Sequence, residues 1–149
     1  VLTPVYATDG SAGFDLSAAE EVMIHPGRTV KIRTGLSFEI PEGYEGQVRP
    51  RSGLSYKTKL RVALGTIDSD YRGEVCVIVD NIGEDVKRIG IGERIAQMVI
   101  SPIVQVAFDV VESLTDTDRG TGGFGSTGLV TVKRKEIEDL HRLISEVMK

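Results

Sequence analysis

The chain has 149 residues, of which 17 are glycine and one is cysteine, and its formal net charge is −4 at pH 7. A single cysteine excludes an internal disulfide, and the lack of a dominant basic patch argues against a nucleic-acid partner. No run approaches the roughly 18 apolar residues of a membrane span. No signal peptide is visible, so we expect a cytoplasmic protein, or a nuclear one if the source is eukaryotic, that is not secreted.

The composition favours one turn-rich all-β domain. Glycine, valine and isoleucine recur with little helical periodicity, and 149 residues suffice for a real core. The lone Cys76 lies in an apolar run and suits a buried position better than a catalytic one. The chain has only two histidines, His25 and His141, which argues against a His-centred triad or a multi-His metal site. Any catalysis is expected to use carboxylates, arginines and metals that prefer oxygen ligands.

Short strands separated by turns are predicted for the N-terminal third. After an extended start and a loop, Asp15 stands between two hydrophobic residues. This position is costly unless the carboxylate is paired, accepts backbone N–H groups or faces a site. Period-two spacing predicts half-buried strands, one of them bent at Thr34-Gly35. The predicted strands are Glu21–Ile24, Arg28–Ile40 and Glu45–Val48.

Arginine and serine come together in the stretch Arg49–Lys57. Ser52 is placed to cap a short helical turn near Leu54, with free backbone N–H groups just after it. A helix start flanked by arginine and serine can bind an anion. The alternative is an ordinary cap with solvated arginines, which the local sequence slightly favours.

The most informative stretch, Gly65–Gly73, lies between the apolar runs Leu60–Leu64 and Val75–Val79. Strand, turn and strand predict a β-hairpin whose tip carries two carboxylates, a phenol and a guanidinium. A turn needs none of this chemistry for its backbone angles alone. Asp68 on a rigid hairpin can act as a general base, and Tyr71 can present a flat face to a sugar or a base. The alternative is that the carboxylates only bond their own turn.

Three more strands are predicted downstream, at Val86–Ile89, Arg94–Ile100 and Val104–Val111. The second of them is mostly apolar but carries one amide, Gln97. This side chain is expected either to face solvent or to reach a ligand.

The C-terminal part has two different segments. Arg119–Gly128 contains five glycines in ten residues, with an arginine, an aromatic and hydroxyls. Instead of a plain linker, such a segment can fold over a phosphate with its backbone N–H groups while Phe124 caps a base, so it is a candidate lid. Lys133–Lys149 shows helical spacing of apolar residues and is expected to dock on a surface or on a partner. The apolar positions are Ile137, Leu140, Leu143, Ile144 and Val147.

Five segments occur in the order found in the trimeric all-β deoxyuridine triphosphate nucleotidohydrolases (dUTPases), and the chain resembles this family over residues 5–128. The segments are Ala12–Leu16, Pro50–Leu54, Gly65–Gly73, Gly92–Gln97 and Arg119–Gly128. One glycine-rich tail would be weak evidence, whereas five ordered motifs at sensible spacing are specific.

The resemblance implies a homotrimer of jelly-roll-like β-barrel subunits built from short strands, with one short helix near residue 54 and active sites across subunit interfaces. It implies a β domain over residues 1–128, with the lid at 119–128. The helical spacing after it, which the resemblance does not cover, predicts a helical extension at 129–149. The implied reaction is hydrolysis of dUTP to dUMP and pyrophosphate by water attacking the α-phosphorus, with Mg²⁺ on the triphosphate. That reaction limits uracil incorporation into DNA and supplies dUMP for dTMP synthesis.

By position, the resemblance assigns catalysis to Asp68, which would orient and deprotonate the water, and to Arg51 and Arg119. Asp15 would position the hydrated metal, and Tyr71 would pack under the deoxyribose and exclude a 2′-hydroxyl. The uracil edge would be read by Gly65, Thr66 and Ile67, and the phosphates would be held by Ser52, Gly53 and Gln97. The lid would close from another subunit. It would place Phe124 on the uracil face, and its other substrate-binding residues would be Gly125, Ser126 and Thr127.

Two features depart from the family's pattern, and two other functions compete with this one. Arg61–Leu64 has no glycine or asparagine, so base recognition would rest on the main chain, and the helical tail exceeds the family's core.

A dCTP deaminase shares the fold, but the Gly65–Gly73 sequence matches the hydrolase. A nucleotide sensor that has lost catalysis is disfavoured, because Asp68, Arg51 and the full tail are present.

Overall fold

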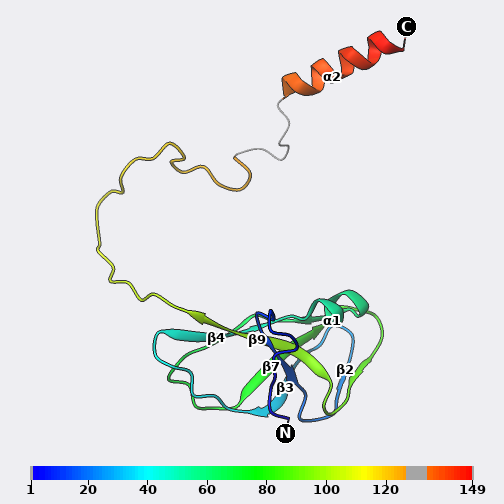
Figure 1. Cartoon of the computed structure of the whole chain (residues 1–149), viewed down its shortest axis with the longest axis vertical. Coiled ribbons are helices and arrows are strands. Elements are labelled where there is room, and N and C mark those ends of the chain that lie inside the picture. Colours follow the sequence, from blue (N-terminus) through cyan, green and yellow to red (C-terminus); the bar gives the residue numbers. More distant parts are fainter. Residues whose placement is uncertain (1, 127–133, 149) are drawn as a thin grey trace. The chain divides into compact units, whose positions relative to one another are not determined.

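The computed structural model describes residues 2–126 and 134–148, and the chain divides into two units, Val1–Val106 and Ala107–Lys149 (Figure 1). All described strands belong to the first unit. They are β1 Phe14–Ser17, β2 Val22–Ile24, β3 Thr29–Leu36, β4 Tyr44–Arg49, β5 Leu60–Val62, β6 Gly65–Ile67, β7 Val75–Asn81, β8 Lys87–Ile89 and β9 Arg94–Pro102, and the helices are α1 Ser52–Lys57 and α2 Arg134–Val147. Neither described helix is both long and apolar enough to cross a membrane.

The strands pair antiparallel in three sheets, ordered β1-β9-β4-β6, β2-β8 and β3-β7-β5. Strand alternation builds the core: in β7, Val75, Val77 and Val79 are buried while Ile78 between them is exposed. Each such fully buried aliphatic side chain contributes about 1.5–3 kcal/mol. The all-β prediction is confirmed, although strand pairing in the described residues leaves the barrel open.

The bend predicted in the third strand is confirmed. The pairing of β3 with β7 shifts register between Arg33 and Leu36, and Gly35 has a φ of 72°. This left-handed backbone favours glycine, which has no Cβ to clash. Bulged strands of this kind often aim a side chain or loop toward a site.

The prediction of an uninterrupted hairpin is wrong. β5 and β7 do pair antiparallel, with Val62 opposite Val79. Between them the chain leaves their sheet, and β6 pairs with the edge of β4, where Gly46 lies opposite Ile67. This pairing satisfies backbone groups that β4 would otherwise leave open. The loop that carries Asp68 therefore connects two sheets.

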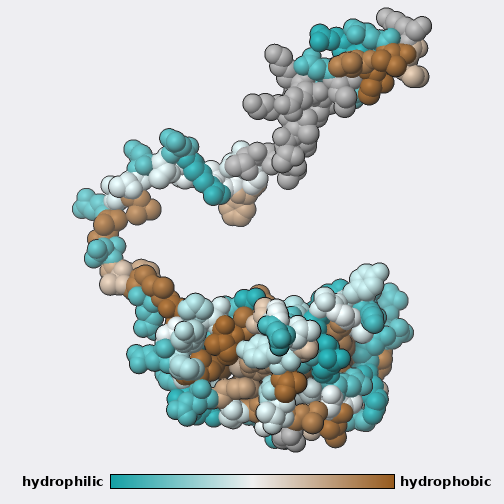
Figure 2. All heavy atoms as spheres, in the orientation of Figure 1, coloured by the Kyte–Doolittle hydropathy of each residue, from teal (hydrophilic) through white to brown (hydrophobic). Residues whose placement is uncertain are grey.

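Two further predictions need correction. Ser52 does not cap α1: Arg51 is the N-cap residue, and no side chain caps this end of the helix. The segment Val104–Val111 is not a strand in the described chain. Its apolar side chains are exposed, Phe108 by 90 %, and Figure 2 shows apolar and polar residues interspersed along the segment after β9. A strand needs a partner for its backbone groups, and none of the described strands pairs with this segment.

Helix α2 confirms the predicted helical tail in residues 134–147. Its described apolar residues Leu143, Ile144 and Val147 are exposed. The side chains of Ile137 and Leu140, like Lys133 and Lys149, lie outside what the structure describes.

Candidate active site

A small cavity of about 270 Å³ brings together three of the five sequence motifs. β1 places Asp15 opposite Gln97 on β9, and the turn after β4 brings Arg51 beside them. Gln97 Nε2 donates to the carbonyl of Pro50 at 2.9 Å, which fixes that turn on the strand. The expected phosphate-site residues Ser52 and Gly53 line the same cavity.

The charge of this cavity is positive overall. Asp15 accepts Arg51 Nε at 2.7 Å on one carboxylate oxygen and Arg94 Nη1 at 3.0 Å on the other. Two guanidinium groups therefore share one carboxylate, and the Arg51 side chain remains 26 % exposed. Arginines held in this way can take a phosphate with their remaining N–H groups. The costly position of Asp15 is thus explained by pairing.

Arg94 is a site residue that the sequence reasoning missed. It opens β9 and lines the cavity with Arg51, whose Nη1 donates to the Arg94 carbonyl at 3.2 Å. A usable signal was present, since Arg94 stands in the same motif as Gln97. The alternation of buried and exposed residues could not predict which way the Arg94 side chain points, because Arg94 is the first residue of β9.

Asp68 lies in a second and larger cavity of about 960 Å³. Its walls are formed by Glu39–Glu45, by Ile103 and Gln105 after β9, and by Asp68, Ser69, Asp70 and Arg72. Asp68 is exposed, and within residues 2–126 and 134–148 its carboxylate makes no hydrogen bond or ion pair. It is therefore free to accept a proton or a hydrogen bond from a ligand.

The strand before Asp68 presents a free edge. β6 ends the order of its sheet and pairs only with β4 in the part of the chain that is described. Backbone groups on the other edge of Gly65, Thr66 and Ile67 are open to an in-plane partner, as on any edge strand. Main-chain recognition of a flat, hydrogen-bonding ligand fits this edge.

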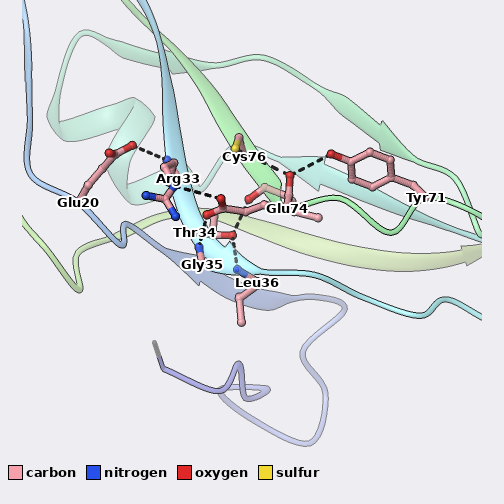
Figure 3. A network of polar contacts seen from close by, with 9 residues as sticks. Glu20, Arg33, Thr34, Gly35, Leu36, Tyr71, Glu74 and Cys76 are labelled. Carbon is pink, nitrogen blue, oxygen red and sulfur yellow. Dashed lines mark hydrogen bonds and ion pairs between the residues drawn. The ribbon is translucent and has the colours of Figure 1, made fainter.

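Tyr71 and Glu74 belong to a polar network that crosses from the loop to β3 (Figure 3). The hydrogen bond from Arg33 and the backbone N–H of Gly35 lower the pKa of Glu74, and the same pairing with Glu74 raises the pKa of Arg33. Burial raises the pKa of the Cys76 thiol, which agrees with a non-catalytic position.

The two cavities share no lining residue. Asp15, Arg51, Ser52, Gly53 and Gln97 lie around one, and Asp68 lines the other. One copy of the chain does not bring the expected base to the expected phosphate groups.

The candidate lid, described over residues 119–126, consists of consecutive turns. Gly122 N donates to the Arg119 carbonyl at 3.0 Å, and Ser126 N donates to that of Gly123 at 3.0 Å. Phe124 is fully exposed with a φ of 49°, and Gly125 follows with a φ of 93°. A positive φ is uncommon for an aromatic residue, and residues held in such sparsely populated backbone conformations cluster at active sites and ligand clamps. Thr127 lies outside the described residues.

The chemistry of the small cavity suits a metal that arrives with its substrate. Among the described residues, no group of three or more His, Cys, Asp or Glu side chains could hold an ion. Asp15 offers a single carboxylate, already shared by two arginines. Mg²⁺ usually keeps several waters and binds one or two carboxylates plus substrate phosphates, so this donor set fits it.

Comparison with known proteins places the chain in a family. The dUTPase family model matches residues 2–128. A deoxyuridine 5′-triphosphate nucleotidohydrolase of Nautilia profundicola is 54 % identical over 129 residues, covering 85 % of this chain and 91 % of that protein. One of Bdellovibrio bacteriovorus is 53 % identical, covering 84 % and 87 %. The chain belongs to the dUTPase family.

Solved structures agree. The Staphylococcus bacteriophage 80alpha dUTPase with dUpNHpp superposes with a TM-score of 0.83 at 33 % identity, over 87 % of this chain and 93 % of that one. A mutant dUTPase from phage phi11 of S. aureus, described with a structural Mg(II) ion, gives a TM-score of 0.71 at 28 % identity, over 76 % and 91 %. The predicted family, fold and class of enzyme are confirmed.

Proposed function

We propose that the chain is a dUTP diphosphatase whose active site forms between copies of the chain. The single observation that carries this proposal is the division of the expected machinery between two cavities. An arginine-rich cavity suits the phosphates, and a separate one holds an unpaired carboxylate, Asp68. A heterologous interface can bring one patch of a copy against the other patch of its neighbour.

The reaction follows from these groups. The oxygen of a water molecule bonds to the α-phosphorus, and its proton passes to the Asp68 carboxylate. The bond between that phosphorus and the oxygen bridging to the β-phosphate breaks, releasing dUMP and pyrophosphate. Arg51 and Arg94, with Gln97 beside them, neutralise and orient the phosphates, which is most of what phosphoryl transfer requires. Asp15 would help to hold the hydrated Mg²⁺, which would supply further charge neutralisation. The product serves dTMP synthesis, and removal of dUTP limits uracil incorporation into DNA.

A homotrimer is the assembly we propose, as the family resemblance implies. The exposed apolar residues after β9 support an assembly, because Val104, Val106, Phe108 and Val110 alternate as in a half-buried strand but are exposed in the single copy. A neighbouring copy would supply the missing strand partner.

Nucleotide selectivity is proposed to come from three elements. The open edge of β6 reads the uracil edge through backbone groups, and swapped donors and acceptors on cytosine would leave buried groups unpaired. Tyr71 packs under the deoxyribose. Arg119, Phe124, Ser126 and Thr127 close from the lid of another copy, with Phe124 on the uracil face.

A pyrophosphate-release assay with dUTP, dCTP, dTTP and UTP tests the proposal. We expect turnover of dUTP and none above background for the other three nucleotides. Ammonia release from dCTP would instead identify a deaminase. Tight dUTP binding without any turnover would identify a nucleotide sensor.

The C-terminal helix is a separate proposal. The family model ends at residue 128, so α2 lies beyond the matched domain. Its exposed apolar residues suit a further partner. The prediction of a cytoplasmic or nuclear location stays a prediction.

A further inference from the structure

Glu74 joins the Asp68 loop to the bulge in β3 (Figure 3). It is the last residue before β7. Its Oε2 accepts from Arg33 Nε at 3.0 Å, and its Oε1 accepts from the backbone N–H of Gly35 at 2.7 Å. Both donors belong to β3, so one carboxylate holds two successive parts of the bulge.

The bulge needs this carboxylate. Between Arg33 and Leu36 the ladder to β7 shifts register, so the Gly35 N–H has lost its strand partner. A backbone donor left unpaired is costly, and Glu74 satisfies it. The buried Thr34 adds a second tie, because its Oγ1 donates to the Val75 carbonyl at 2.5 Å. The end of the Asp68 loop is therefore fixed to β3 at adjacent residues.

Glu74 also contacts Tyr71, through its backbone carbonyl instead of its carboxylate. The Glu74 carbonyl accepts from the Tyr71 hydroxyl at 3.1 Å, and Tyr71 N donates to the Asp68 carbonyl at 3.1 Å. The ring lies directly over Gly73: a Cβ on that residue would stand 2.3 Å from the Tyr71 hydroxyl oxygen and 2.5 Å from Cζ. The ring is therefore held by one hydrogen bond at its hydroxyl, the backbone of Tyr71 is held by another, and the ring occupies the space that a side chain on Gly73 would fill.

We propose that Glu74 and Gly73 are positioning residues that fix the Tyr71 ring and thereby set the discrimination between deoxyribose and ribose. Tyr71 remains 43 % exposed, so the ring is held without being covered. A sugar pocket rejects an extra hydroxyl only when its wall cannot move away, and the link through Glu74 to the β3 bulge provides that rigidity. This inference rests on the proposed function, with Tyr71 under the sugar.

The test compares kcat/KM for dUTP and UTP in the full chain, with UTP assayed at an enzyme concentration high enough to measure its slow turnover or to set an upper limit on it. Glu74→Ala and Gly73→Ala are each expected to lower the dUTP-to-UTP ratio by about tenfold, because a loosened ring admits the 2′-hydroxyl. Glu74→Gln, which can still accept from Gly35, should restore much of the ratio. Glu84→Ala removes an exposed carboxylate outside this network and should leave the ratio unchanged.

The outcomes separate the two proposals. If the wild-type chain does not turn over dUTP, the proposed function is wrong. If it prefers dUTP and the Glu74 and Gly73 variants lose rate equally for both nucleotides, Glu74 is only structural and the inference is overturned. Where Glu74→Ala fails to fold by circular dichroism, Gly73→Ala gives the decision, and an unchanged dUTP-to-UTP ratio in that variant overturns the inference.

Discussion

Replacing Asp68 by Asn is expected to lower kcat for dUTP by at least about a hundredfold while leaving nucleotide affinity within about threefold of wild type. The amide keeps the shape of the side chain but cannot accept the proton of the attacking water. Asp68 makes no ion pair in the described chain, so the substitution breaks no structural contact. Steady-state pyrophosphate release gives kcat, and calorimetric titration with a non-hydrolysable dUTP analogue gives the affinity.

Asp70→Asn is the matched control. Asp70 lines the same cavity, is also exposed and lies two residues away, so the variant loses the same charge from the same loop. We expect its kcat to change by less than about threefold. Normal turnover by Asp68→Asn, or an equal loss in both variants, would show that Asp68 is not the base.

Removing the candidate lid is expected to have the second large effect. A chain stopped after Asp118 loses Arg119, Phe124 and Ser126, and we expect kcat/KM for dUTP to fall by at least about a hundredfold. The reason is the loss of a guanidinium and of backbone donors that neutralise phosphate charge, together with the aromatic cover that excludes water. Phe124 makes no aromatic contact among the described residues, so its loss removes no core packing.

A chain stopped after Gly128 separates the lid from the helix. It keeps all the lid residues and lacks α2, and we expect nearly full dUTP turnover. Equal activity of the two shortened chains would contradict a catalytic role for the lid. Trimer formation and partner binding, measured on the chain stopped after Gly128, test the role of α2, and no change in either would remove support for an additional partner.

Local chemistry in the sequence predicted much of the candidate site. Asp15 between two hydrophobic residues required a partner, and the structure provides Arg51 and Arg94. The bend at Thr34-Gly35 followed from a glycine within an alternating strand and is present. These predictions succeed because they depend on the residue and its immediate neighbours.

The failures depend on partners that a local pattern does not identify. Val104–Val111 alternates like a strand, but none of the described strands pairs with it. Gly65–Ile67 read as the start of a hairpin tip, yet the open edge of β4 takes it into another sheet. Glu74 carried no signal of its own, because its role depends on a register shift in β3, about forty residues earlier in the chain.

The shared active site is tested most directly by mixing two inactive chains. Asp68→Asn and Arg51→Ala, co-expressed with different affinity tags and purified through both, form mixed assemblies. If Asp68 of one copy works with Arg51 of its neighbour, about one site in three of a mixed trimer holds both intact residues, and dUTP turnover should rise to about a third of wild type. If each copy instead builds its own site, every site stays defective and the mixture remains as inactive as the two parents, which would contradict a site formed between copies.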